Sequence, residues 1–152
     1  MALYSGETST SGMKRNKRRL TMGYQVKKRV LVIDDIGVIL DLVAFLLQKG
    51  GYDVVTATDA SSALALIEKI TPDLILLDVM MPNMNGYEFI AQLRQRQNQR
   101  ATIPIMLLTV KEHTPEEVEQ LGAVGYLRKP FHQKELLGKI EELLSDTDND
   151  AQ

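Results

Sequence analysis

The chain has no cysteine among its 152 residues, which excludes disulfide bonds and metal sites built from thiolates. It has no apolar run approaching the roughly 20 residues that a membrane-spanning helix needs. The basic cluster near the N-terminus is not followed by the apolar stretch of a signal peptide. We therefore expect a cytoplasmic protein without membrane association. A hydrophobic content of 44% and a charged content of 25% are ordinary for a globular domain.

The net charge of −2 combines two parts of opposite charge. Residues 1–28 hold seven basic side chains and one acidic, or +6, whereas the rest holds 11 basic and 19 acidic, or −8. The first part shows no apolar period, which predicts a basic, disordered N-terminal extension. Its segment "MKRNKRRL" lacks interleaved aromatics, so nucleic acid is not expected as a partner. Residues 29–144 predict one domain, and 145–152 predict an acidic, disordered tail.

Short apolar runs alternate with amphipathic segments along the predicted domain. Near-continuous apolar strands that alternate with helices indicate a parallel sheet covered on both faces. The predicted fold is α/β: a flavodoxin-like, doubly wound, five-stranded parallel sheet of order 2-1-3-4-5 with five helices. The predicted strands are 29–34, 53–57, 73–78, 103–109 and 125–129, and the predicted helices are 39–47, 60–67, 86–97, 114–122 and 132–144.

Polar residues gather where four of these strands end: Asp34 and Asp35, then Asp78, Thr109 and Lys129. The predicted order brings the four ends together at the edge of the sheet where ligands bind. Three clustered carboxylates cannot all stay ionised without help, and an oxygen-loving cation such as Mg²⁺ or Mn²⁺ would supply it. A carboxylate in such a site can attack phosphorus and form an aspartyl-phosphate. Each residue alone has an ordinary structural explanation, such as helix capping or surface exposure, but their joint placement favours phosphoryl chemistry.

Four stretches, "VLVIDD", "DLILLDVMMPNMNG", "IMLLT" and "GYLRKPF", resemble the receiver domain of two-component response regulators over roughly 29–144. The resemblance implies that Asp78 accepts a phosphoryl group from a histidine kinase or a histidine phosphotransfer protein. It also implies that Asp35 ligates Mg²⁺ directly, Asp34 mainly through water, and Met80 through its backbone carbonyl.

The same resemblance assigns roles on the other strand ends. Thr109 would bond a phosphoryl oxygen and move inward after phosphorylation, and Lys129 would pair with the phosphate. Tyr126 would be the aromatic switch that follows Thr109, although without the resemblance a half-buried structural tyrosine is the better interpretation. Pro130 would follow a cis peptide bond.

Two residues near the acceptor, Met80 and Lys111, occupy positions that tune dephosphorylation in this family. An apolar side chain and a long cation hinder water, so we expect the phosphorylated form to decay slowly. The chain also departs from the family pattern. The 20 residues from Thr109 to Lys129 are slightly fewer than usual, which shortens the fourth helix, and Gly125 stands where an acidic residue is frequent. The short helix puts the usual dimer arrangement in doubt.

The predicted function is a single-domain response regulator whose phosphorylation switches its contact with an unknown protein target. A homodimer formed on phosphorylation and a phosphorelay intermediate are alternative outputs. The chain would not be an enzyme beyond phosphorylating and dephosphorylating its own Asp78. A Mg²⁺-dependent phosphohydrolase would usually carry a second Asp at the position of Met80. A nucleotide binder would need a Gly-rich loop in place of "DDIGVI", and a scaffold without chemistry would not need the five intact residues.

Overall fold

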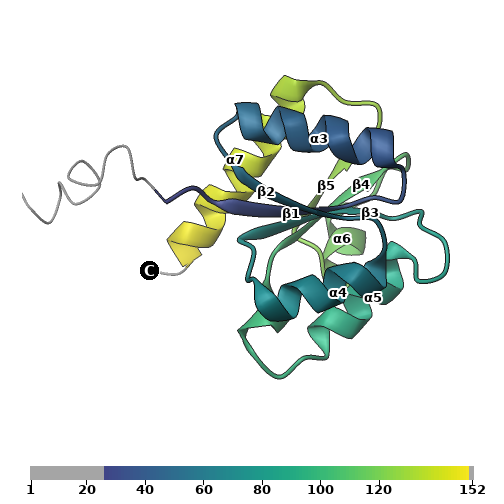
Figure 1. Cartoon of the computed structure of the whole chain (residues 1–152). Helices are drawn as coiled ribbons and strands as arrows, with labels where there is room; N and C mark the ends of the chain where they lie inside the picture. Colours follow the sequence, from purple (N-terminus) through teal and green to yellow (C-terminus); the bar gives the residue numbers. More distant parts are fainter. Residues whose placement is uncertain (1–25, 151–152) are drawn as a thin grey trace, which may run out of the picture.

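A computed structural model describes residues 26–150, and the side chains of residues 26–146. Its described part contains five strands that alternate with helices (Figure 1). The strands are β1 (Arg29–Ile33), β2 (Asp53–Ala57), β3 (Leu74–Asp78), β4 (Ile105–Thr109) and β5 (Gly125–Arg128). The helices are α3 (Gly37–Lys49), α4 (Ala60–Lys69), α5 (Gly86–Arg94), η2 (Gln99–Thr102, a 3-10 helix), α6 (Pro115–Leu121) and α7 (Gln133–Asp150).

All strands are parallel and lie in the order β2-β1-β3-β4-β5, which confirms the predicted fold. Every residue of β3 and β4 is buried, as expected for strands covered on both faces. Alternate side chains of the strands enter two separate cores. Helices α4, α5 and α6 cover one face of the sheet, and α3 and α7 cover the other (Figure 1). Leu31 and Leu77 belong to the core on the first face, and Val32 and Leu76 to the core on the second.

Side-chain caps fix where several helices begin. Asp59 accepts the backbone N–H of Ser62 at the start of α4, and Thr114 accepts that of Glu117 before Pro115. Asn85 forms a reciprocal capping box with Glu88 at the start of α5. These caps set the helices that follow β2, β3 and β4 at the edge of the sheet where the polar residues lie.

The last helix differs from the prediction. It was expected to end at residue 144 and to give way to a disordered tail, but α7 continues to Asp150. No glycine or proline follows Leu144, so nothing in the backbone stops the helix once its packed turns have formed. Disorder was predicted for the N-terminal extension, residues 1–28, of which residues 1–25 lie outside the described range.

Two smaller differences lie around α5. The helix ends at Arg94 rather than at residue 97, and the short helix η2 follows it, which the sequence did not indicate. Within residues 26–150, no helix combines the length and the apolar character needed to cross a bilayer.

Candidate functional site

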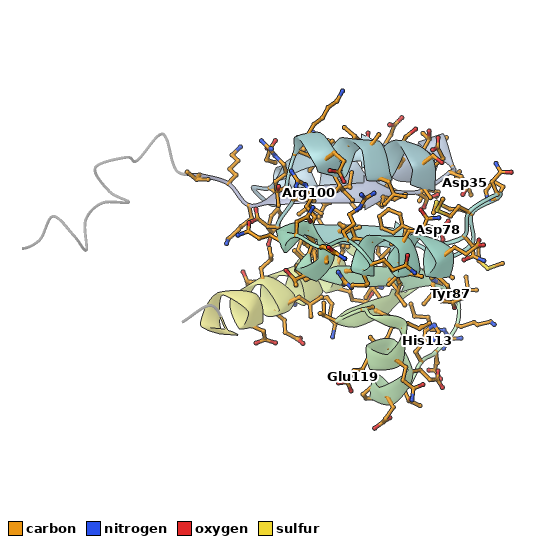
Figure 2. The ribbon with its side chains drawn as sticks, turned by 90° about the horizontal axis from the view of Figure 1, so that it is seen from below. Asp35, Asp78, Tyr87, Arg100, His113 and Glu119 are labelled. Carbon is orange, nitrogen blue, oxygen red and sulfur yellow. The ribbon has the colours of Figure 1, made fainter. Side chains whose placement is uncertain are left out.

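Three carboxylates meet at the carboxyl ends of β1 and β3. Asp78 is the last residue of β3, and Asp34 and Asp35 directly follow β1, its neighbour in the sheet. One oxygen from each lies within 4.8 Å of the others. Asp34 and Asp78 are 1% and 5% exposed, whereas Asp35 is open to solvent. Figure 2 shows Asp35 and Asp78 at the same end of the domain. The predicted convergence of these three residues is therefore present.

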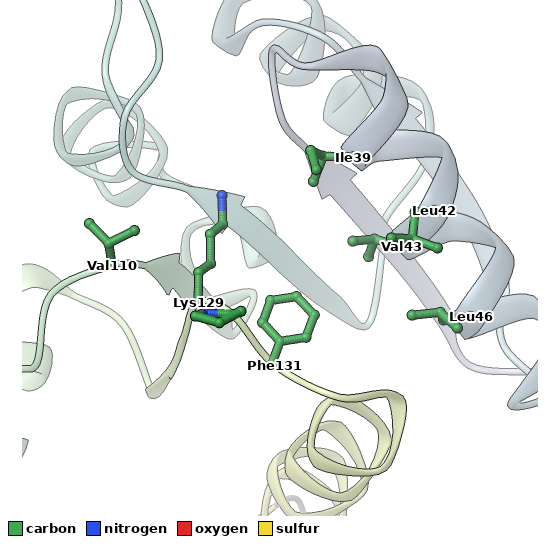
Figure 3. Close-up of a pocket in the computed structure, with 8 residues that line it drawn as sticks. Ile39, Leu42, Val43, Leu46, Val110, Lys129 and Phe131 are labelled. Carbon is green, nitrogen blue, oxygen red and sulfur yellow. The ribbon is translucent and has the colours of Figure 1, made fainter.

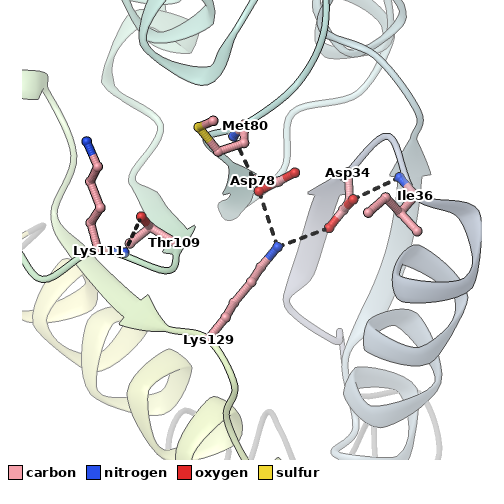
Figure 4. A network of polar contacts seen from close by, with 7 residues as sticks. All are labelled: Asp34, Ile36, Asp78, Met80, Thr109, Lys111 and Lys129. Atoms are coloured by element: carbon pink, nitrogen blue, oxygen red, sulfur yellow. Dashed lines mark hydrogen bonds and ion pairs between the residues drawn. The ribbon is translucent and has the colours of Figure 1, made fainter.

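Lys129 reaches this cluster from the end of β5. Its Nζ lies 3.2 Å from Oδ1 of Asp78 and 3.7 Å from Oδ2 of Asp34 (Figure 4). The peptide bond between Lys129 and Pro130 is cis, as the resemblance implied. The ammonium thus contacts two of the three clustered carboxyl groups.

Burial raises the pKa of the Asp78 carboxyl above its ordinary value. The ammonium of Lys129 opposes this shift, and the nearby Asp34 carboxylate adds to it. Oδ1 of Asp78 also accepts the backbone N–H of Met80 at 3.4 Å. The site thus disfavours the ionised form of Asp78, and a cation bound nearby would favour that form and lower the pKa of the carboxyl.

Only one of the two carboxylate oxygens of Asp34 accepts a hydrogen bond among the described residues. Its Oδ1 accepts the N–H of Ile36 at 2.9 Å, but Oδ2 is buried without a hydrogen-bond partner among the described residues. Lys129 lies near that oxygen at ion-pair distance only. A buried, incompletely satisfied carboxylate oxygen beside two further carboxylates is the donor set that a hard divalent cation binds.

Thr109 ends β4 and is 4% exposed. Its hydroxyl accepts the backbone N–H of Lys111 at 3.1 Å, in a local turn that directs the oxygen toward Lys111 (Figure 4). The side chain of Met80 is 73% exposed and that of Lys111 is also open to solvent. Both residues predicted to tune dephosphorylation are therefore exposed, and their backbone N–H groups bond to Asp78 and Thr109, respectively.

Tyr126, on β5, lies farther from the carboxylates and packs with the core beneath α4, α5 and α6. Its ring contacts that of His113, a residue that no motif in the sequence marks. A single histidine just before a helix cap carries no periodic signal, so only the fold reveals this pair. Both residues line a groove bounded by α6, β5 and α7.

An apolar cavity of about 420 Å³ adjoins the site on the other face of the sheet. It lies between α3 and the segment after β5, and Lys129 forms part of its wall (Figure 3). The lining residues are Ile39, Leu42, Val43, Leu46, Val110, Lys129, Pro130 and Phe131.

The sequence profile of the response regulator receiver domain matches residues 30–141. The chain belongs to the response regulator receiver family. Receiver domains are signalling domains of two-component systems, so the family that the four stretches indicated is confirmed and phosphorylation signalling is supported. The roles of the individual residues stay predictions.

Solved receiver structures share the fold. The chemotaxis protein CheY4 of Vibrio cholerae is 40% identical with a TM-score of 0.70, and the match covers 77% of this chain and 98% of CheY4. The receiver domain of the sensor histidine kinase PA1611 from Pseudomonas aeruginosa is 27% identical with a TM-score of 0.70, covering 79% of this chain and 99% of that domain. The PA1611 structure holds a magnesium ion coordinated in its active-site cleft.

Two curated relatives are transcriptional regulators. The alkaline phosphatase synthesis regulator PhoP of Bacillus subtilis is 40% identical over 121 residues, which are 78% of this chain and 49% of PhoP. The DNA-binding dual master transcriptional regulator RpaA of Synechocystis is 39% identical over 122 residues, 79% of this chain and 50% of RpaA. The chain thus spans about half the length of these relatives. RpaA is named as DNA-binding, so the expectation that nucleic acid is an unlikely partner is not supported for the longer relatives.

Proposed function

We propose that Asp78 accepts a phosphoryl group from a histidine kinase or a histidine phosphotransfer protein in the cytoplasm, and that phosphorylation switches contact with a protein target. The observation that carries this proposal is the position of Asp78. Its carboxylate is buried at the end of the central strand, 3.2 Å from the Lys129 ammonium and beside Asp34 and Asp35. Burying clustered carboxylates costs free energy, and such clusters are typical of functional sites.

The donor set fits a divalent cation, Mg²⁺ or Mn²⁺. Asp34, Asp35, Asp78 and the backbone carbonyl of Met80 would hold it. Oδ2 of Asp34, which lacks a hydrogen-bond partner among the described residues, supports this assignment. When bound, the cation would neutralise negative charge on the transferring phosphoryl oxygens.

The residues of the chain supply the other parts of the reaction. A carboxylate oxygen of Asp78 attacks phosphorus, the bond from phosphorus to the donor histidine nitrogen breaks, and a P–O bond to Asp78 forms. Lys129 already lies against Oδ1 of Asp78 and can follow the incoming charge. The hydroxyl of Thr109 leaves its turn with Lys111 and donates to a phosphoryl oxygen. Tyr126 then changes position with Thr109, which alters the surface that a target or a second copy reads.

The protein donor docks on the exposed apolar side of α3. Val38, Leu42 and Phe45 are 76%, 52% and 55% exposed on this helix, and Leu42 also lines the cavity that reaches Lys129. Three exposed apolar residues on one helix, next to an apolar cavity, indicate a surface that binds another protein. A donor helix placed there brings its histidine to the same edge of the sheet as Asp78.

The phosphorylated form decays slowly in this proposal, because Met80 and Lys111 stand where water would approach the phosphoryl group. A half-life of only seconds for the phosphorylated protein would contradict this part. Onward transfer to another histidine protein is the alternative output, and a short-lived phosphoryl group in the presence of such a protein would favour it.

Incubation with acetyl phosphate and Mg²⁺, followed by intact-mass measurement, tests the proposal. We expect one phosphoryl adduct on the wild type and none on Asp78→Asn. The matched control is Asp41→Asn, which removes an exposed carboxylate from α3 and should leave the adduct in place. An absence of adduct with every donor, together with no binding of beryllofluoride, would instead support a scaffold without chemistry.

A further inference from the structure

We propose that His113 is a positioning residue for the switch: its buried ring holds Tyr126 in the resting arrangement, and this contact must give way on activation. The inference deepens the proposed function and rests on it, because it concerns the equilibrium that phosphorylation would shift. It adds to the roles of Thr109 and Tyr126 a residue that neither motif nor spacing indicated.

The two rings meet edge to face. Their centroids lie 5.3 Å apart with planes at 81°, a favoured geometry for an aromatic pair. The side chain of His113 is only 7% exposed, so the contact is formed away from water. Both residues line a groove of about 580 Å³ between α6 and α7, which leaves room for Tyr126 to change position.

Packing alone does not explain a histidine at this position. Nδ1 lies 3.4 Å from a carboxylate oxygen of Glu117, but Nε2 is buried and lacks a hydrogen-bond partner within the described part of the chain. A leucine or phenylalanine would fill the same space without an unsatisfied nitrogen, which costs free energy. The contacts of its ring with Tyr126 and Glu117, rather than the filling of space, therefore account for a histidine at this position.

His113 lies on the segment that connects Thr109 to the start of α6. The Thr109 hydroxyl is bound to the N–H of Lys111, and Thr114, directly after His113, caps α6. Tyr126 belongs instead to β5, where it pairs with Leu107 in the sheet. Inward movement of Thr109 would displace the connecting segment relative to β5. Because His113 lies on that segment and Tyr126 lies on β5, the displacement would disturb the contact between the two rings.

A second link fastens the same segment to β5, but at the surface. Arg128 donates to the carbonyl of Val110 at 3.2 Å and contacts the carboxylate of Glu112 at 3.2 Å. The Arg128 and Glu112 side chains are 57% and 75% exposed, so solvent weakens their ion pair. This link is exposed and does not involve the two rings, so Arg128 provides the matched control for the buried ring contact.

The test is the affinity for beryllofluoride with Mg²⁺, measured by isothermal titration calorimetry on the full chain. His113→Leu keeps the apolar volume but removes the ring. We expect it to bind beryllofluoride roughly two- to tenfold more tightly than the wild type, since losing a contact specific to the resting state shifts the population toward the active state. His113→Phe should restore the wild-type affinity, and Arg128→Gln should change it less than twofold. His113→Gln, which also lacks a ring, provides the same test if His113→Leu does not fold.

A double-mutant cycle separates positioning from simple packing. In a Tyr126→Ala background the substitution of His113 should have no further effect on affinity, because its partner is already gone. An unchanged affinity in His113→Leu, or an equal gain in the Tyr126→Ala background, would overturn the proposal while leaving the proposed function intact. A wild type that binds no beryllofluoride and takes no phosphoryl group would overturn both.

Discussion

Arg94 joins three segments through one guanidinium group. From the end of α5 it donates to the carbonyl of Gly122 through Nε at 3.1 Å and Nη2 at 2.6 Å. Its Nη1 donates to the carbonyls of Ala101 and Ile103 at 2.7 and 2.8 Å. These carbonyls lie at the end of α6, in η2 and just before β4. We predict that Arg94→Met destabilises the fold more than any loss of a surface charge would.

The expected magnitude follows from the number of carbonyls that lose a charged donor. A hydrogen bond to a charged group contributes about 1.5–3 kcal/mol, and three carbonyls are affected. Arg94 is half-buried, so water replaces part of what is lost, and we expect a decrease of about 3 kcal/mol in the free energy of unfolding. For a domain of this size, this corresponds to a melting temperature lower by about 10 °C.

Urea unfolding followed by circular dichroism measures this difference. The matched control is Arg96→Met, which removes an ion pair with Glu68 at 2.7 Å between partly exposed side chains. Such pairs contribute about 1 kcal/mol or less. If Arg94→Met and Arg96→Met destabilise the protein equally, then the three carbonyls are well hydrated and the reasoning is wrong.

Three other variants test the site and its surroundings. Asp78→Asn should melt at a higher temperature than the wild type at pH 7 in EDTA, because burial raises the pKa of Asp78 and penalises its ionised form. At about pH 3 the Asp78 carboxyl is neutral in the folded and the unfolded protein, so the melting temperatures of wild type and variant should converge there. The wild type becomes less stable than the variant as pH rises through the raised pKa of Asp78. A difference in melting temperature that stays constant with pH would exclude ionisation of Asp78 as its cause. Leu42→Glu should block phosphorylation by a histidine kinase but not by acetyl phosphate, as read on Phos-tag gels, whereas equal loss with both donors would place the defect in the site. Gly86→Ala would put a Cβ 2.9 Å from Cα of Val79, and we expect about 1–3 kcal/mol of destabilisation in urea; a neutral result would mean that the turn relaxes freely.

The acidic site could be predicted from the sequence because its geometry follows from sheet topology. Parallel strands end at one edge, so Asp34, Asp78 and Lys129 had to meet once the strand order was fixed. The caps at Asp59 and Thr114 followed from local rules in the same way. Asn85 with Glu88 three residues later matches the capping-box pattern, so that signal was present in the sequence and not used.

Arg94 and His113 could not be predicted, for a different physical reason. The partners of Arg94 are backbone carbonyls, and the one in Gly122 is 28 positions away. A carbonyl exists at every residue, so nothing in the sequence marks those that will point toward a guanidinium. The contact between His113 and Tyr126 likewise depends on how far the segment after β4 folds back over β5, which the residue pattern does not specify.

The two unpredicted residues act on opposite ends of the short fourth helix of the domain. α6 has seven residues, too few to be stable by itself, and depends on contacts at its ends. At its C-terminal end Gly122 adopts φ 89°, and its carbonyl is held by a charged donor. Its N-terminal end follows His113, whose contact with Tyr126 is a single ring pair with an unsatisfied nitrogen. The C-terminal end of α6 is thus held more strongly than the N-terminal end, which is the end nearer to Thr109. When Thr109 moves, we therefore expect α6 to rotate about Gly122.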